Sequence, residues 1–384
     1  MNQDIIDFYV KVRRRSEEIC KPLNTEDYIP QPAVHVSPMK WQLAHTTWFF
    51  EQMILKKYAI EFHEFDESFN FLFNSYYNNV GERTFRADRG SITRPTVAQV
   101  YEYRSFVDQE ILEFLKAELE PKVRSLFLLG LNHEQQHQEL MLTDLKFTLS
   151  KNPLCPVYSS EINLVNQYNS EVGFVAIEEG IFKIGSRATD FCFDNELGRH
   201  KTYLQTFEIS RALVTNGEFL EFIDAGGYSN FNLWLDEGWA WINQNEINSP
   251  LYWEKVDDTW FQYSLDGYQK VDMNAILCHI SFYEANAFAA WKGMRLPTEF
   301  EWETASTQLN WGKRWEWTNS AYLPYPNFKI DDGAVGEYNG KFMINQMVLR
   351  GASTATAEGH SRNTYRNFFH PHYQWQFTGI RLAK

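Results

Sequence analysis

Hydrophobic residues in the first 150 positions recur at intervals of three and four, and this spacing is typical of amphipathic helices. The pattern predicts four of them. The expected helices cover about 3–20, a stretch that follows Ser37-Pro38, about 95–118, and a stretch that begins near Pro121. Ser37 suits the N-cap of the second helix and Pro38 its first position. Four helices of this length favour a four-helix bundle over residues 1–150.

A long connection joins the second and third expected helices. It reads FNFLFNSYYNNVGERTFRADRGSITRP, residues 69–95, and is rich in aromatic and charged residues. Long connections inside compact domains are usually functional or disordered, and the aromatic content of this one speaks against disorder. We therefore expect a functional loop that covers part of the bundle.

The hydrophobic pattern changes after residue 150. Two prolines interrupt KNPLCPVYSSEIN, so we expect a linker over 151–170 and a second domain over 171–384. In GFVAIEEGIFKIG (173–185) apolar and polar residues alternate between glycines, which predicts strands and a turn. Short helices are expected at 216–225 and 281–292, whereas LWLDEGWAWI, WEWTNSAY and VLRGAS are expected to form short strands and loops. The predicted fold class is α+β with two domains.

Composition narrows the class of protein. A net charge of −14 provides no basic stripe to displace the counterions of nucleic acid, so we expect no nucleic-acid partner. No apolar run approaches the length of a membrane span. The four cysteines are far apart in the sequence, which is typical of a reducing compartment, and we expect a cytoplasmic protein. Its oligomeric state cannot be read from the sequence.

The strongest candidate for a functional site is the segment LNHEQQHQELML, residues 131–142. His133 and His137 are four apart and share one face of a helix, so both imidazoles can bind one metal ion. Gln136 lies on that face, whereas Glu134 does not. The segment also spells the H-E-x-x-H of zinc peptidases, but the position six after His137, where a metzincin has a third histidine, is a threonine.

A third ligand is expected from another helix. In KWQLAHTTWFFE, His45 lies on the apolar face of the second expected helix. Three histidines leave two or three coordination positions open. They would suit zinc or iron(II), and the ligands alone do not decide between these metals.

The motifs together resemble the ergothioneine-biosynthesis sulfoxide synthases of the EgtB type. SPMKWQLAHTTWFFE and HEQQHQEL are followed in the same order by GIFKIG, RLPTEFEWE, WEWT, VLRGAS and YRNFFHPHYQWQFTGIRL. The resemblance implies a DinB-like four-helix bundle followed by a formylglycine-generating-enzyme-like domain of C-type-lectin fold. It also implies an iron(II) cofactor and the O2-dependent joining of a thiol to the imidazole C2 of hercynine, Nα-trimethylhistidine, as a sulfoxide.

The resemblance assigns roles to individual residues. It implies that His45, His133 and His137 bind the iron and that Gln136 and Asn367 contact hercynine. An aromatic wall that includes Phe368 and Phe369 would attract the trimethylammonium group. An arginine of the long loop would bind the carboxylate of the thiol, with Arg86 favoured over Arg83 and Arg89. A loop tyrosine, Tyr77 before Tyr76, would serve the oxygen chemistry, with Tyr325 in reserve.

Several alternatives stay open at this point. The thiol is cysteine or γ-glutamylcysteine, and an ovothiol-type synthase that makes 5-histidylcysteine sulfoxide or a selenoneine-type synthase would share these motifs. A non-catalytic metal- or ligand-binding protein is the alternative from another class. A formylglycine-generating enzyme is disfavoured because that chemistry uses a cysteine pair near the end of the domain, and residues 279–384 contain no cysteine. RLPTEFEWE, with Glu299 and Glu301, is expected to be structural.

Overall fold

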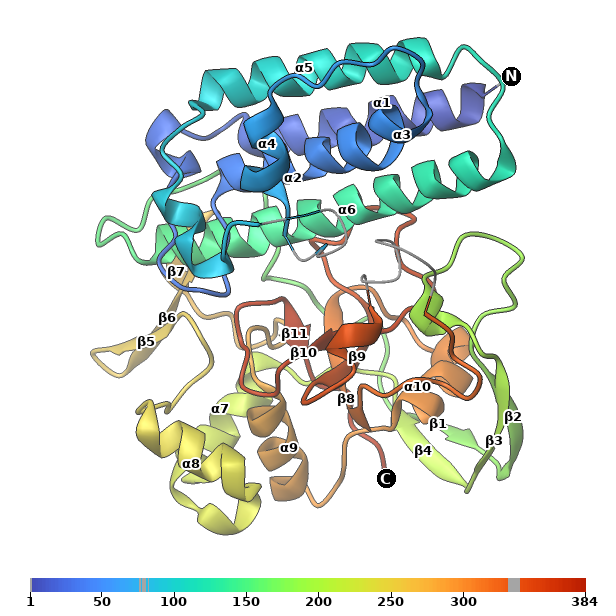
Figure 1. The fold of residues 1–384 in the computed structure, drawn as a ribbon. Coiled ribbons are helices and arrows are strands. Elements are labelled where there is room, and N and C mark those ends of the chain that lie inside the picture. The colour runs from blue at the N-terminus through green and yellow to red at the C-terminus, as the bar shows by residue number, and fades with distance from the viewer. Residues whose placement is uncertain (1, 76, 78–80, 82, 331–338) are drawn as a thin grey trace. The chain divides into compact units, whose positions relative to one another are not determined.

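The chain forms two compact units, which together have the α+β organisation expected from the sequence. The computed structural model describes residues 2–75, 77, 81, 83–330 and 339–384 (Figure 1). The first unit comprises the described residues up to Tyr158, and the second comprises those from Ser159 onward. This division falls inside the segment expected to be a linker.

Four long helices build the first unit. They are α1 (Gln3–Cys20), α2 (Met39–Phe50), α5 (Val97–Phe114) and α6 (Pro121–Ser150). α1 packs against α6, and α2 packs against both α5 and α6 (Figure 1). α2 continues through a π-helical turn, η2 (Glu51–Leu55), into α3 (Lys56–Tyr58). The predicted helical bundle is therefore confirmed.

The ends of two helices differ from the prediction. The N-cap of α2 is Pro38 rather than Ser37, and no side chain caps this helix. The Ser37 hydroxyl is engaged elsewhere, because it accepts a hydrogen bond from Arg89. α5 ends at Phe114 rather than near Glu118, since Asn2 Nδ2 bonds the carbonyls of Leu115 and Ala117 and holds that backbone outside the helix.

The long connection between α2 and α5 is partly helical, which the sequence pattern did not predict. It includes α4 (Glu67–Phe73), whose first turn is capped by the Asp66 carboxylate, and the 3₁₀ helix η3 (Arg86–Ser91). A further 3₁₀ helix, η1 (Thr25–Tyr28), follows α1. The chain segment that carries the candidate loop residues is therefore anchored at both ends by short helices.

Short strands and helices make up the second unit. The strands are β1 (Phe174–Ile177), β2 (Gly180–Ile184), β3 (His200–Leu204), β4 (Phe207–Ser210), β5 (Trp253–Val256), β6 (Thr259–Ser264), β7 (Gly267–Lys270), β8 (Arg314–Ala321), β9 (Met347–Ala352), β10 (Asn367–Phe369) and β11 (Thr378–Gly379). The helices are α7 (Asn216–Asp224), α8 (Asp236–Gln244), α9 (Phe282–Trp291) and α10 (Glu299–Ala305), with 3₁₀ helices η4 (Asp194–Glu196), η5 (Gly227–Ser229), η6 (Phe231–Leu233), η7 (Ser306–Gln308) and η9 (Gly340–Phe342).

The strands of this unit associate in small sheets. Within the described residues, the largest sheet has the order β10-β9-β8-β11, and β5, β6 and β7 form a second sheet. β1 and β2, the two strands expected in 173–185, do not pair with each other: β1 pairs with β4 and β2 pairs with β3. α10 packs on these pairs, and its Trp302 is fully buried in their core.

One helix of the second unit contradicts the prediction. LWLDEGWAWI was expected to form strands or loops, but residues 236–244 form α8. Asp236 and Glu237 occupy its first turn, where acidic side chains favour the positive end of the helix dipole. The predicted helices at 216–225 and 281–292 are confirmed as α7 and α9, and the WEWT and VLRGAS segments lie in β8 and β9.

Buried arginines hold the irregular backbone of the second unit together. Arg314 is fully buried and donates to the carbonyls of Leu164 (3.1 Å), Ile276 (3.0 Å) and Leu277 (3.1 Å). Buried carbonyls outside regular strands need such donors. This explains how a unit with so few long elements retains a well-packed core.

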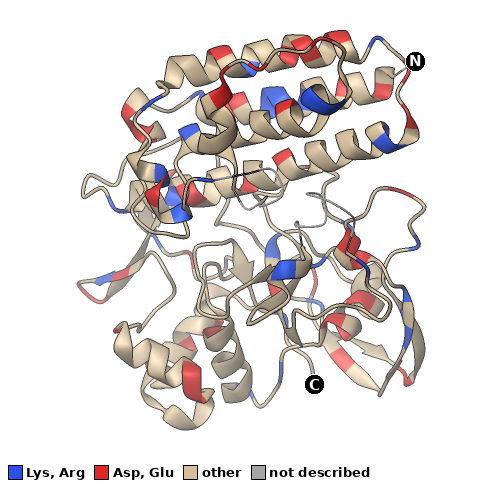
Figure 2. Cartoon of the chain, in the orientation of Figure 1, with Lys and Arg blue, Asp and Glu red and all other residues tan. Residues whose placement is uncertain are grey.

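Charged residues of both signs are interspersed along the helices, strands and loops of both units (Figure 2). None of the helices in the described part of the chain combines the length and the hydropathy that crossing a bilayer requires.

Candidate metal centre

Three buried imidazoles converge in the helical unit. His45 extends from α2, and His133 and His137 extend from neighbouring turns of α6. One ligand nitrogen from each lies within 4.8 Å of the other two. The spacing of a histidine pair on one helix and the approach of a second helix therefore create the donor set of a metal site.

The tautomer of His45 leaves one nitrogen available for a metal. Its Nδ1 lies 2.6 Å from the carbonyl oxygen of Phe73, at the end of α4. A carbonyl oxygen only accepts, so Nδ1 carries the hydrogen and the lone pair is on Nε2. Nε2 is buried and has no hydrogen-bond partner among the described residues. A buried lone pair with no donor is costly unless it is a ligand, and this fits a metal at the centre.

A second chain of hydrogen bonds orients His137. Gln42 Nε2 donates to Asp144 (2.9 Å), so its Oε1 faces His137 and accepts from Nδ1. The Asp144 carboxylate also accepts from the backbone N–H of Ser37 (2.9 Å). This arrangement places the free lone pair of His137 on Nε2. Sequence reasoning missed Gln42 and Asp144, although Gln42 is three residues before His45 and Asp144 is seven after His137, on the same helix faces.

Burial keeps all three imidazoles neutral at neutral pH. It lowers the pKa of His133 to about 4, against a smaller opposing effect of Glu134. Burial also lowers the pKa values of His45 and His137 well below the usual 6.5, and the neighbouring histidines lower them further. A neutral imidazole is the form that binds a metal, so these shifts suit a ligand set.

Aromatic rings surround the three histidines. Trp41 stacks on His45 with ring centroids 4.5 Å apart, and Trp48 stacks on the same imidazole at 5.7 Å. Phe49 lies 5.1 Å from His133. Gly130 of α6 permits this packing, because a Cβ at that position would come within 2.7 Å of the Phe49 ring. The walls of the centre exclude water and fix the rotamers of its ligands.

Glu134 belongs to a different network. Its carboxylate accepts from Arg13 (3.0 Å), Arg104 (2.6 Å) and Ser16 (2.6 Å), all buried with it between α1, α5 and α6. Burial alone raises the pKa of Glu134, but the two arginines and the Ser16 hydroxyl outweigh it and hold the pKa at about 2. Glu134 is therefore a structural ion, not the general base beside a metal that the peptidase motif requires.

The structure places Tyr77 close to the aromatic wall. Its side chain is buried and stacks on Trp48 at 5.5 Å, on the same indole that stacks on His45. Asn74 holds the backbone of Tyr77 through hydrogen bonds to its N–H (3.2 Å) and carbonyl (3.1 Å). Tyr76, the second candidate, lies outside the described residues.

The three loop arginines have different surroundings. Arg89 is buried, its guanidinium lies 3.3 Å from the centroid of Trp41, and its Nη1 donates to Ser37 (2.9 Å). Arg86 is exposed and donates to the carbonyl of His35 (2.6 Å). Arg83 donates to the carbonyl of Ser75 (3.0 Å). Of the three, Arg89 lies against the wall of the histidine centre.

The other residues that the sequence predicted to contact hercynine belong to different units. Gln136 is half-buried on α6, next to His137. Asn367, Phe368 and Phe369 belong to the second unit, where they form β10 at an edge of the largest sheet and are half-buried. Phe368 stacks on Tyr322 at 4.0 Å.

Tyr325, the reserve tyrosine, is buried within the second unit and donates to Glu299 (3.0 Å). The same carboxylate pairs with Arg366 (2.8 and 3.0 Å). Glu301 caps α10 through Thr298 and pairs with Arg295. Both glutamates therefore have structural partners, as expected for RLPTEFEWE.

Both units match known domain families. Residues 9–141 match the DinB superfamily, and residues 161–320 match the sulfatase-modifying factor enzyme 1-like domain. The fold and the histidine site thus define a two-domain protein in which a DinB-like helical bundle carries a buried three-histidine site and precedes a sulfatase-modifying-factor-like domain.

Relatives of known name align with different shares of this chain. The hercynine oxygenase of Mycolicibacterium smegmatis is 30% identical over 310 residues, which cover 67% of this chain and 71% of the relative. That of Mycobacterium tuberculosis is 28% identical over 346 residues and covers 78% of this chain and 80% of the relative. The formylglycine-generating enzyme of Thermomonospora curvata is 31% identical over 201 residues, 47% of this chain and 66% of the relative. This chain belongs to the hercynine oxygenase family.

Proposed function

We propose that this protein is an iron(II)- and O2-dependent sulfoxide synthase that joins a thiol, cysteine or γ-glutamylcysteine, to the imidazole C2 of hercynine. In the overall reaction a C–S bond replaces the C2–H and S–H bonds. One oxygen atom of O2 is transferred to sulfur, and the other leaves as water with the two hydrogens. The reaction needs no further oxidant or reductant.

The observation that carries this proposal is the convergence of three buried imidazoles, two of which are held in a fixed orientation. Backbone and amide acceptors hold His45 and His137 with Nε2 free, and the Nε2 atom of His45 has no hydrogen-bond partner in the described structure. Three imidazoles leave coordination positions open for reactants. Iron(II), when bound, supplies the redox chemistry with O2 that zinc cannot supply. The names of the relatives, hercynine oxygenases, favour this metal.

The chain's own residues would position the substrates. In this proposal Gln136 and Asn367 contact the imidazole and the amino-acid end of hercynine. Phe368 and Phe369 contact its trimethylammonium group, because aromatic faces attract this cation. Arg86 is our first candidate for the thiol carboxylate, since its exposed guanidinium donates one hydrogen bond to a backbone carbonyl and has further N–H donors.

Arg89 and Arg83 are the other candidates for the thiol carboxylate. Arg89 would act from the wall beside Trp41, where it also adds positive potential near the histidines. Its burial makes it the arginine whose charge is screened least by solvent.

Tyr77 is proposed to move a proton during the reaction. It is buried against Trp48 and within the same aromatic wall as His45. We expect Tyr77→Phe to reduce sulfoxide formation and to divert turnover toward simple oxidation of the thiol, because a phenol can donate a proton that phenylalanine lacks. Product analysis with unchanged sulfoxide yield and no added thiol oxidation would refute this role.

The main test is reconstitution of the full chain with iron(II) under anaerobic conditions, followed by exposure to O2 with hercynine and each thiol. O2 consumption, product mass and loss of the imidazole C2 proton by NMR would be measured. Substitution at C5 instead would indicate the ovothiol-type reaction, and a product formed only with a selenium donor would indicate the selenoneine type. If the iron-loaded chain consumed no O2 with hercynine and either thiol, the proposal would be refuted and a non-catalytic metal-binding protein would be favoured.

A matched pair of histidine variants controls this test. We expect His45→Ala to weaken metal binding by more than about 100-fold, because loss of a partner outside the ligand set alone costs 10- to 100-fold. His63→Ala removes an exposed histidine of the same unit and should bind the metal like the wild type. Equal metal affinity of the two variants, measured by chelator competition, would exclude His45 as a ligand.

A further inference from the structure

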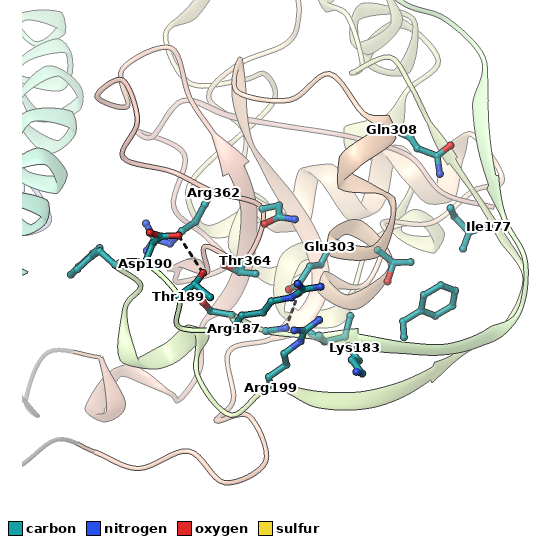
Figure 3. Close-up of a pocket in the computed structure, with 17 residues that line it drawn as sticks. Ile177, Lys183, Arg187, Thr189, Asp190, Arg199, Glu303, Gln308, Arg362 and Thr364 are labelled. Atoms are coloured by element: carbon teal, nitrogen blue, oxygen red, sulfur yellow. Dashed lines mark hydrogen bonds between the residues drawn. The ribbon is translucent and has the colours of Figure 1, made fainter.

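The second unit contains a cavity of about 640 Å³ that the proposed function does not use (Figure 3). It lies between β2, the start of β3, α10 and the segments 186–191 and 362–364. Its volume is within the range of about 300–1,000 Å³ that small-molecule sites occupy. The metal ligands and the residues assigned above to hercynine and the thiol do not line it.

Positive charge predominates in this cavity. Its lining includes Lys183, Arg187, Arg199 and Arg362, against the carboxylates of Asp190 and Glu303. Lys183, Arg187 and Arg199 lie together on one side of the cavity, below Glu303 in the view of Figure 3.

Two of the charged groups are already neutralised by residues outside the lining. Arg362 pairs with Glu196 (Nε–Oε2 2.9 Å). Glu303 pairs with Arg350 and also accepts from the backbone N–H of Gly185 (2.7 Å).

Three exposed cationic side chains and one carboxylate, that of Asp190, therefore remain in the lining. The Asp190 carboxylate accepts from the Thr189 hydroxyl (3.2 Å). Within the described residues, Lys183, Arg187 and Arg199 have no ion-pair partner. Such a cluster in a chain of net charge −14 raises the local concentration of anions.

Other groups complete a binding site. Thr304, on α10, lines the cavity, and its buried hydroxyl has no hydrogen-bond partner among the described residues. An unmade hydrogen bond of this kind costs free energy that a bound acceptor would recover. Ile177, Phe182 and Phe191 supply apolar wall.

We propose that this cavity binds an organic anion that carries at least two phosphate or carboxylate groups on an apolar or aromatic body. The guanidinium groups of Arg187 and Arg199 bind the anionic oxygens, because planar guanidinium matches both groups in a bidentate geometry. Lys183 adds a third charge, the Thr304 hydroxyl donates to the ligand, and the body packs on the apolar wall.

The test is calorimetric titration of the metal-free 384-residue chain with three probes: adenosine 5′-diphosphate, isophthalate and pyrophosphate. The first two join a double anion to an aromatic body and differ in the anionic group, whereas pyrophosphate has no apolar body. We expect adenosine 5′-diphosphate or isophthalate, according to which group the site prefers, to bind at least about tenfold more tightly than pyrophosphate. Failure of both to bind, or equal affinity for all three probes, would overturn the proposal.

A charge-matched pair of variants locates the site. We expect R187Q/R199Q to weaken binding by about 10- to 100-fold, in keeping with the loss of hydrogen bonds between charged groups. K255Q/K270Q removes the same charge from exposed positions on the β5–β6–β7 sheet, on the other side of this unit in Figure 1, and should bind like the wild type. Similar losses in both variants would mean attraction by overall charge and would overturn the proposal.

The Thr304→Val variant distinguishes an effect on ligand binding from an effect on protein stability. It removes a buried hydroxyl that has no partner, so the unfolding midpoint of the free protein should stay the same or rise. Affinity for the better probe should fall severalfold. Unchanged affinity would show that the Thr304 hydroxyl does not take part in binding. Because no metal is added, these results are independent of whether the chain makes a sulfoxide.

Discussion

The side chain of Gln42 fixes the tautomer and the ring orientation of His137 relative to the other two histidines. Its amide bridges Asp144 and the imidazole, so that His137 is held in one tautomer and one ring orientation. Such partners of metal ligands raise affinity without touching the metal.

We expect Gln42→Met, which keeps the length of the side chain but removes the acceptor, to lower metal affinity about 10- to 100-fold. Chelator competition on the purified chain measures this. Gln109→Met, at an exposed position of α5, is the matched control. If both variants retained wild-type affinity, the bridge would have no effect on the ligand.

His360 makes the stability of the second unit depend on pH. Burial, reinforced by the nearby Arg362, lowers the pKa of this imidazole to about 3. The unfolded chain therefore binds the proton at a higher pH than the folded one, and stability falls as pH falls below about 6.5 and continues to fall to about 3.

We expect the buried His360 to lower the free energy of unfolding by about 2 kcal/mol at pH 5 relative to pH 7.5. Urea unfolding at the two pH values measures it. His360→Asn, which does not titrate, should show a shallower pH dependence than the wild type. An unchanged slope in His360→Asn would contradict the prediction, whatever that variant's stability at pH 7.5.

At the scale of elements, α6 has two functional faces. His133 and His137 face α2, whereas Glu134 faces α1 and α5 and joins them through Arg13 and Arg104. The ion network fixes the rotation of α6 about its own axis and hence the direction of both imidazoles. A buried charge left without its partner is strongly destabilising.

We therefore expect Glu134→Gln to lower the free energy of unfolding of the helical unit by about 3–5 kcal/mol. Glu113→Gln, which breaks an exposed pair with Lys116, should cost less than about 1 kcal/mol. Denaturant unfolding followed by far-ultraviolet circular dichroism compares them. A Glu134→Gln variant as stable as Glu113→Gln would show that the network does not hold the bundle together.

At the scale of the whole molecule, the three-histidine site and the cavity belong to different units, each with its own core. Within the described residues, His45, His133 and His137 are the group that can hold a metal ion. A ligand that binds only the folded state stabilises the unit that binds it.

At about 100 times its dissociation constant, the metal should stabilise the helical unit by about 2.7 kcal/mol. Hydrogen exchange followed by mass spectrometry should show slower exchange in α2 and α6 and little change in β8 and β9. The reverse pattern would contradict a metal site in the bundle.

Local patterns predicted much of the fold. The helix over 3–20 has the predicted bounds, and α5 begins at Val97, close to its predicted start, with Thr96 as its N-cap. α8 was not predicted because its tryptophans are typical of strands, although acidic residues occupy its first turn. α4 was missed because its aromatic run shows no clear period within seven residues.

The histidine site was predictable because ligand spacing is a property of one helix. Its hydrogen-bonded partners were not, because Gln42 meets His137 across 95 residues of chain and Phe73 meets His45 across 28. The cavity of the second unit could not be anticipated for the same reason: Lys183, Thr304 and Arg362 have no common sequence pattern.

The sequence by itself determined the four long helices and which helix faces carry histidine, because these depend on periodicity and capping within a few residues. Only the tertiary structure decided that His45 keeps a free lone pair, that Glu134 is a buried counter-ion instead of a catalytic base, and that three cations share one cavity. Each of these depends on distances between groups far apart in the chain, and packing alone sets those distances.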